Sequence, residues 1–185
     1  MYGMVNEAVR GLVKKHHGDE VWHSIHTAAK TPESFVTMES YDDDMTYRLV
    51  TACSKLLKQD PETILRTFGA YWISDVAMVH YGGLMNNTGS NFASFLKNLD
   101  HMHQGMKVVF PDYHPPSFRV IDIAPNKVQV DYYSKREGLL PFVEGLFEGL
   151  AKHFSTTINI EHIPDATHQL PCKRIMVTIK DGSTE

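Results

Sequence analysis

Apolar residues in the first 100 or so positions recur at intervals of three and four, the period of amphipathic helices that pack by one face. Gly18 follows the first such stretch and predicts its end, because glycine accommodates the cap after a helix. Asp60, Pro61 and Glu62 predict a helix start, since a capping side chain, a proline in the first turn and an acid near the N-terminus agree. We predict helices over residues 1–17, 19–30, 42–59, 61–76 and 91–107, with a turn-rich link over 80–90.

The pattern changes at Ser117, where β-branched and aromatic residues begin to alternate. The turn dipeptide Pro125-Asn126 predicts a hairpin, and helical spacing returns after it. The order of helices, two strands, a helix and two strands predicts an α+β fold, with a mostly antiparallel four-stranded sheet behind a helical half. The predicted strands cover 117–123, 127–135, 156–163 and 173–180, and the predicted helix between the pairs covers 137–154.

The length of 185 residues and the 42% hydrophobic content predict one well-cored domain over residues 1–185. A net charge of -4 leaves no basic stripe and argues against a nucleic-acid partner. No apolar run approaches the ~20 residues of a membrane span, and the start lacks the features of a signal peptide, so we expect a cytoplasmic protein. Cys53 and Cys172 belong to no metal or disulfide motif, and we expect both thiols to be reduced.

The predicted helix over 91–107 carries a histidine on its apolar face. His103 lies four residues after Leu99 and therefore joins the stripe, whereas His101 lies about 200° round the helix from Leu99. Burying a neutral imidazole costs a few kcal/mol unless its nitrogens find partners, so His103 implies a hydrogen bond or a metal. A hydrogen-bonded core histidine is the plainer of these two interpretations. The other apolar members of the stripe are Phe92, Phe95, Leu96, Met102 and Met106.

Three hydrogen-bond donors continue the inward face of the second predicted strand. Residues two apart in a strand share a face, so Tyr132, Ser134 and Arg136 follow Val128 and Val130. An arginine is rarely buried without an anion, and its planar fork binds a carboxylate with two parallel hydrogen bonds. An anionic ligand is therefore implied. The alternative is that the strand ends at Tyr132 and that the two following donors lie in a solvated turn.

Haem is one ligand that needs both features, because its iron takes a single imidazole while its propionates need cationic and hydroxyl partners. The stretches MYGMVNEAV, FLKNLDHMH, PPSFR and above all YYSKREGL resemble the haem nitric oxide/oxygen-binding (H-NOX) family, which includes the haem domain of the soluble guanylate cyclase β subunit. The likeness extends over nearly the whole chain. It implies a helical distal half, mainly residues 1–60, and a proximal half of helices and sheet, mainly 61–185, with non-covalent ferrous haem b between them.

The resemblance also implies roles for particular residues. His103 is similar in position to the axial iron ligand, and Tyr132, Ser134 and Arg136 to the propionate clamp. Pro116 matches the proline that presses on the haem, although a rigid entry to the first strand explains it equally well.

Oxygen-binding members of the family carry a distal tyrosine six residues after the motif arginine, where this chain has Phe142. Bound O2 needs a hydrogen-bond donor in a dry pocket, whereas NO binds ferrous haem tightly without one. We therefore expect a sensor that binds nitric oxide and carbon monoxide and excludes O2, although an indole donor from Trp72 would permit an O2 sensor. The expected distal pocket consists of Val5, Val9, Trp72, Phe142 and Leu146; for all of these except Trp72, plain core packing is an equal explanation.

The resemblance implies a sensor domain, not an enzyme, that acts on a partner such as a histidine kinase or a cyclic-nucleotide cyclase. The hypothesis is that NO binding releases His103, lets the haem relax against Pro116 and shifts the two halves. A haem storage or carrier protein is an alternative. A haem peroxidase would need a distal His and Arg pair, and a metal hydrolase would need further ligands at motif spacing; the sequence offers neither.

Overall fold

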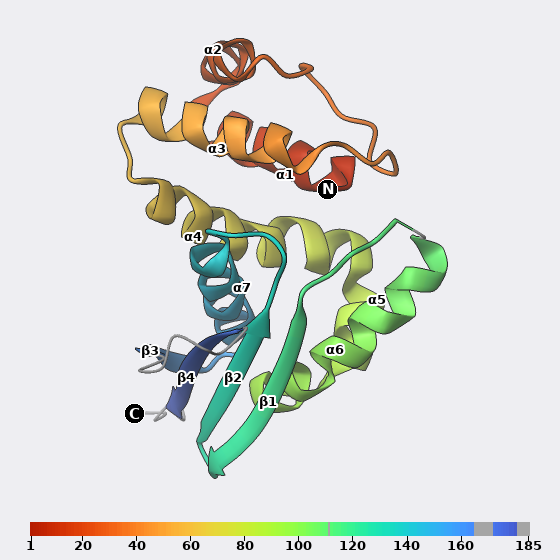
Figure 1. Cartoon of the computed structure of the whole chain (residues 1–185), viewed down its shortest axis with the longest axis vertical. Helices are drawn as coiled ribbons and strands as arrows, with labels where there is room; N and C mark the ends of the chain where they lie inside the picture. Colours follow the sequence, from red (N-terminus) through yellow and green to blue (C-terminus); the bar gives the residue numbers. More distant parts are fainter. Residues whose placement is uncertain (111, 165–171, 181–185) are drawn as a thin grey trace.

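The computed structural model describes residues 1–110, 112–164 and 172–180. Three helices lie together at one end of the molecule, and the sheet with its covering helices lies at the other (Figure 1). Helix α4 passes between these two parts. Among the described residues, no helix has both the length and the apolar character of a membrane span. The elements are α1 (Gly3–His17), α2 (Asp19–Ala29), α3 (Asp43–Leu57), α4 (Pro61–Tyr71), η1 (Trp72–Ala77), α5 (Met78–Thr88), α6 (Phe92–Val109), β1 (Ser117–Ala124), β2 (Lys127–Tyr133), α7 (Leu140–His153), β3 (Thr157–Ile163) and β4 (Lys173–Lys180).

Local chemistry accounts for several helix ends. The Asp60 carboxylate accepts hydrogen bonds from the backbone N–H groups of Glu62 and Thr63, as its sequence context predicted. Asn91 and the side chain of Ser94 form a capping box at the start of α6. Gly18 ends α1 at φ 86°, a backbone conformation that residues with a side chain rarely adopt. Helix boundaries set by such near neighbours were therefore predicted well.

The link predicted over 80–90 is wrong, because α5 continues to Thr88. It follows η1, a six-residue π-helix, and is kinked at Tyr81, where φ is -128°. Two glycines inside a helix cost about 1 kcal/mol each, which made a turn the natural prediction. Burial of Met85 and Thr88, and a 2.8 Å hydrogen bond from the Asn98 side chain to the Thr88 carbonyl, favour the helix instead.

The four strands form one antiparallel sheet in the order β1-β2-β4-β3, which confirms the predicted α+β architecture. Val128, Val130 and Tyr132 of β2 are buried, as their alternation predicted. The second strand, however, ends at Tyr133, so Ser134 and Arg136 lie beyond it. Ser134 Oγ accepts the Arg136 backbone N–H at 3.0 Å, and this local hydrogen bond replaces the pairing that a longer strand would have made.

Buried apolar side chains form two clusters. The N-terminal cluster joins α1, α2 and α3, and α4 contributes Ile64, Leu65 and Phe68 to it. The C-terminal cluster joins α5, α6 and α7 to one face of the sheet. Helix α4 therefore packs with the first three helices through these side chains, while its Gly69 lies against α7.

Helices α4 and α7 join the two clusters by close backbone contact. A Cβ atom on Gly69 would lie 2.2 Å from the Phe142 carbonyl oxygen, and one on Gly145 would lie 2.0 Å from that of Arg66. Gly149 is less crowded, since a Cβ atom there would lie 2.9 Å from the Ile73 side chain and 3.1 Å from the Ala70 carbonyl oxygen. Only glycine permits the approach at Gly69 and Gly145. These two residues and Gly149 together define the glycine seam between the halves.

Candidate functional site

A cavity of about 220 Å3 lies between the two halves, and most of the side chains around it are apolar. Its walls come from the start of α1, from η1, from one face of α6, from the linker between α6 and β1, and from α7. The cavity brings together residues that are far apart in the sequence. Nine of the predicted site residues line it, namely Val5, Trp72, His103, Pro116, Tyr132, Ser134, Arg136, Phe142 and Leu146.

Val9 is the exception, because it does not line this cavity. It is buried in the N-terminal cluster and lines a different cavity, with Cys53 and Phe68 among its neighbours there. Val5 and Val9 share one stripe of α1, but the cavity reaches only the first turn of that helix. Helical phase shows which face is buried but not how far along the helix a cavity extends.

His103 projects from α6 into the cavity, while His101 is exposed, as the helical phase predicted. Its Nδ1 atom is buried and has no hydrogen-bond partner among the described residues. Burial lowers the pKa of His103 to about 4, although the Asp100 carboxylate and the Pro116 backbone act in the opposite direction. The imidazole is therefore neutral at physiological pH, which is the form that binds a metal.

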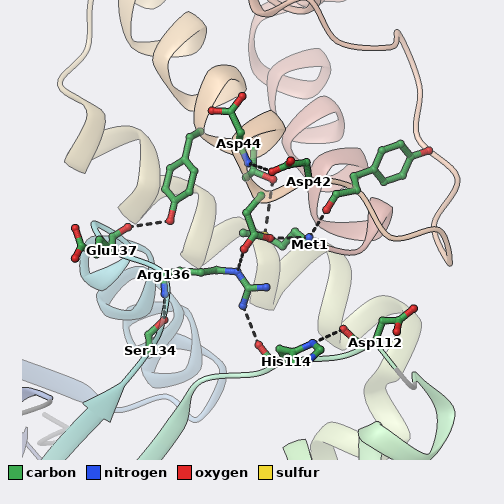
Figure 2. Close-up of polar contacts among 12 residues, drawn as sticks. Met1, Asp42, Asp44, Asp112, His114, Ser134, Arg136 and Glu137 are labelled. Carbon is green, nitrogen blue, oxygen red and sulfur yellow. Dashed lines mark hydrogen bonds and ion pairs between the residues drawn. The ribbon is translucent and has the colours of Figure 1, made fainter.

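The anion-binding side of the cavity combines the end of β2 with the turn that follows it. Tyr132 is buried, and burial raises the pKa of its phenol, while a hydrogen bond with Ser134 opposes this shift. Arg136 donates from Nε to Asp43 Oδ2 at 2.7 Å and from Nη1 to the His114 carbonyl at 2.8 Å (Figure 2). No described residue accepts a hydrogen bond from its Nη2 atom. The guanidinium is thus held in place with donor capacity left for a ligand.

Asp43 is a member of this site that the sequence analysis missed. Its Oδ1 atom also accepts a hydrogen bond from the Met1 ammonium at 2.7 Å. Burial acts to raise the pKa of Asp43, but the hydrogen bonds from Arg136 and from the ammonium lower it below its usual range. In the run Asp42-Asp43-Asp44, Asp42 caps helix α3. The presence of two further acids after the cap was the only sequence signal for an additional role of Asp43.

The opposite side of the cavity is mostly apolar. Phe142 stacks against Phe68, with ring centroids 4.9 Å apart, and Trp72 meets the same ring edge-on at 6.3 Å. The Trp72 side chain adds an indole to this region.

Tyr2 also lines the cavity, but its ring packs against Phe110 at the end of α6, with centroids 5.1 Å apart. The Tyr2 oxygen accepts the Asp112 backbone N–H at 3.2 Å. Tyr2 is a second residue that the sequence analysis missed.

Tyr113 is a third missed residue, and it lies in the linker between α6 and β1. Burial raises the pKa of its phenol to about 12, although the nearby Arg136 acts in the opposite direction. The phenol is therefore neutral at physiological pH. No spacing rule predicts a role for a single aromatic residue in a linker.

The residues present fit haem on their own chemistry. A neutral imidazole that projects into the cavity can ligate iron, and the apolar walls suit a porphyrin. Tyr132, Ser134 and Arg136 suit its carboxylates, because all three can donate hydrogen bonds to them. In the described part of the chain, no group of three or more His, Cys, Asp or Glu side chains could hold a bare metal ion.

Comparison with known proteins agrees with this chemistry. The family described as haem-NO-binding matches residues 2–162. Soluble guanylate cyclase gcy-31 of Caenorhabditis elegans is 21% identical over 97% of this chain and 26% of its own length. The rat guanylate cyclase soluble subunit beta-2 is 35% identical over 52% of this chain and 14% of its own length. The chain therefore spans about a quarter or less of these relatives.

Solved structures share the fold. A mutant H-NOX protein from S. oneidensis in the Fe(II) ligation state superposes with a TM-score of 0.87 at 19% identity, covering 98% of this chain and 97% of that one. An Fe(II) unliganded mutant H-NOX protein from K. algicida gives 0.86 at 20% identity, covering 99% and 98%. Members of this family are haem-binding sensor domains and are not catalytic themselves. With the family match covering most of the chain, the protein belongs to the haem-NO-binding (H-NOX) family of haem-based gas sensors.

Proposed function

We propose that this chain is a nitric oxide sensor that holds ferrous haem b without a covalent bond and uses His103 as the iron ligand. The observation that carries the proposal is the neutral His103 imidazole, which projects from α6 into the cavity between the halves. When bound, haem would supply an iron atom that can bind a diatomic gas. In this proposal Tyr132, Ser134 and Arg136 hold the propionates, and Pro116 packs on the porphyrin.

The proposed gas side contains Val5, Trp72, Phe142 and Leu146, all of which line the cavity. Phe142 has no hydrogen-bond donor, so at this position the pocket lacks a phenol to stabilise the partial charge on bound O2. NO needs no such donor, and CO is also accepted. These side chains exclude water and favour NO and CO over O2.

In the proposed signalling step, α6 would be free to move if His103 were released from the haem, and the Arg136 contacts would transmit the change. Arg136 is bonded to Asp43 of α3 and to the His114 carbonyl in the linker, so movement of its side chain alters contacts in both halves. A gas can bias the two arrangements only by the difference in its free energy between them. We propose that a signalling enzyme, such as a histidine kinase or a cyclic-nucleotide cyclase, reads the change in the cytoplasm.

The test is the absorption spectrum of the reduced protein, purified after expression with haem precursors, without gas and then with O2, CO and NO. We expect a haem band that CO and NO shift and that O2 leaves unchanged. A stable oxy spectrum would overturn O2 exclusion, and Trp72→Phe and Tyr2→Phe would then identify the donor. Absence of any haem band would overturn the whole proposal.

The ligand assignment has its own matched pair of variants. His103→Gly should bind haem only when imidazole is supplied, because the free ligand replaces the missing side chain. His101→Gly should bind haem without imidazole, since His101 is exposed on the other face of α6. The reverse result would show that His101, not His103, is the iron ligand.

The carrier alternative differs from the sensor in kinetics. A carrier should release haem readily to an acceptor such as apomyoglobin, whereas a sensor should retain haem and change its coordination when NO binds. The rate of haem transfer, followed by absorbance, separates the two.

A further inference from the structure

The linker between α6 and β1 places an aromatic ring against the proposed iron ligand. The Tyr113 ring lies 6.0 Å from the His103 ring, with an interplanar angle of 78°. Phe118, at the start of β1, approaches the same imidazole at 5.9 Å and 43°. His103 is therefore bracketed by two aromatic rings from the segment that follows its own helix.

The plane of a metal-ligating imidazole has to be held in place. It almost always is held by a hydrogen bond from the second ring nitrogen to a carbonyl or carboxylate. The Pro116 backbone raises the pKa of His103 as a nearby acceptor would, but Nδ1 has no partner with ordinary hydrogen-bond geometry among the described residues. Packing must therefore supply part of the orientation of the ring, and a T-shaped aromatic contact is directional enough to do so.

The two bracketing rings are themselves held in place. Phe118 is buried and packs against Tyr132 and Phe147, with centroids 5.4 and 6.2 Å away. Tyr113 packs against Phe110 at 6.3 Å, and its backbone N–H donates to the Phe110 carbonyl at 3.0 Å. Phe118 belongs to the sheet and its core, whereas Tyr113 belongs only to the linker. Tyr113 can therefore be changed without disturbing the sheet.

We propose that Tyr113 is a positioning residue for His103, and that its ring, not its hydroxyl, holds the imidazole plane in the orientation needed to bind iron. This inference rests on the proposed haem function. It predicts that losing the ring matters and that losing only the oxygen does not.

The test compares Tyr113→Leu, which removes the ring, with Tyr113→Phe, which keeps it. Tyr71→Leu is the matched control, because Tyr71 is an aromatic residue that packs in the N-terminal cluster and does not line the cavity. The first measurement uses the haem-free proteins and records the imidazole carbon–proton NMR signals of His103, assigned by their loss in His103→Gln. The second measures the iron–histidine stretching band of the reduced, unliganded proteins and their haem dissociation constants.

We expect one narrow set of His103 ring signals in the wild type, in Tyr113→Phe and in Tyr71→Leu, and broadened or multiple signals in Tyr113→Leu. In the haem-loaded proteins, Tyr113→Leu should shift or broaden the iron–histidine band and weaken haem binding about tenfold, the lower end of the usual effect of removing a partner of a metal ligand. Tyr113→Phe should match the wild type in both measurements.

Three results would overturn the inference: wild-type behaviour of Tyr113→Leu, equal damage from Tyr113→Phe, or equal broadening in Tyr71→Leu. If the wild type binds no haem, the proposed function fails. The haem-free measurement still decides whether Tyr113 orients His103, so the two failures can be told apart.

Discussion

The two halves of the molecule meet on two sides that are built differently. On the side of α4 and α7, the glycine seam brings backbone against backbone, and the buried carboxylate of Glu144 pairs with Arg66. On the side of the cavity mouth, polar side chains bridge the gap (Figure 2). There Arg136 is bonded to Asp43, and the Tyr47 hydroxyl donates to the Glu137 carbonyl at 3.0 Å.

The difference indicates which side can open. Close-packed backbones lose many small contacts at once when they separate, so the seam should act as a fixed joint. Partly exposed polar contacts exchange with water at little net cost, so the mouth should open more easily. If the halves shift on ligand binding, we expect them to pivot about the seam.

The largest effect should come from filling the seam. Gly145→Val adds a side chain where even a Cβ atom would lie 2.0 Å from a carbonyl oxygen, so α4 and α7 must separate. We expect the free energy of unfolding to fall by about 3 kcal/mol, measured by urea denaturation. Gly105→Ala is the matched control, because nothing lies within 4 Å of the added atom. That variant should be up to about 1 kcal/mol more stable. Equal stability of Gly145→Val and the wild type would refute the fixed joint.

On the mouth side, the largest effect should be on the proposed ligand. Arg136→Gln removes a charged donor and should raise the haem dissociation constant about tenfold to a hundredfold, since hydrogen bonds to charged groups contribute about 1.5–3 kcal/mol. Haem transfer to apomyoglobin measures this. Arg119→Gln changes an exposed arginine of β1 that does not line the cavity, and it should behave like the wild type. Equal haem retention by Arg136→Gln would remove this arginine from the clamp.

Asp43→Asn breaks the bridge but keeps the arginine. We expect a loss of less than about 1 kcal/mol in the free energy of unfolding of the haem-free protein, because such pairs are partly solvated. The folded-state pKa of Asp43 is lowered, so its contribution is complete above about pH 4 and is lost as the pH falls through that lowered value. Denaturation at a series of pH values should show the wild type and variant converging in acid. A difference that grows as the pH falls would contradict this account.

The smallest effect should come from Tyr47→Phe, which removes one exposed hydrogen bond between α3 and the turn before α7. About 0.5 kcal/mol is expected, measured as a small shift in the denaturation midpoint. A loss as large as that of Gly145→Val would mean that the two sides do not differ.

Much of the fold was predictable because its signals are local. The Asp60 cap, the end of α1 and the inward phase of His103 each depend on residues within a few positions. The strands that were predicted pair in one antiparallel sheet. Where neighbouring and distant interactions compete, the prediction failed. The segment over 80–90 is helical because Met85 and Thr88 find a core that the local sequence does not contain.

The candidate site was predictable only in part. A helical stripe pointed to His103, and strand alternation pointed to Tyr132, Ser134 and Arg136. The resemblance to a family added Pro116. Val9 does not line the cavity, since phase along one helix does not show where a cavity ends. The sequence analysis missed Asp43, Tyr2 and Tyr113. Each contacts another residue of the site, namely Arg136, Asp112 and His103 respectively, and no sequence pattern connects the members of these pairs.

The amino-acid sequence by itself determined the helices, the strands and which side chains turn inward, since these follow from backbone geometry and from hydrogen bonds between near neighbours. The tertiary structure decided where those inward faces stop and what they enclose. It brought Asp43 to Arg136 across 93 positions and left one nitrogen of His103 buried without a partner. Such contacts depend on how whole helices pack against one another, and no short stretch of sequence records that packing.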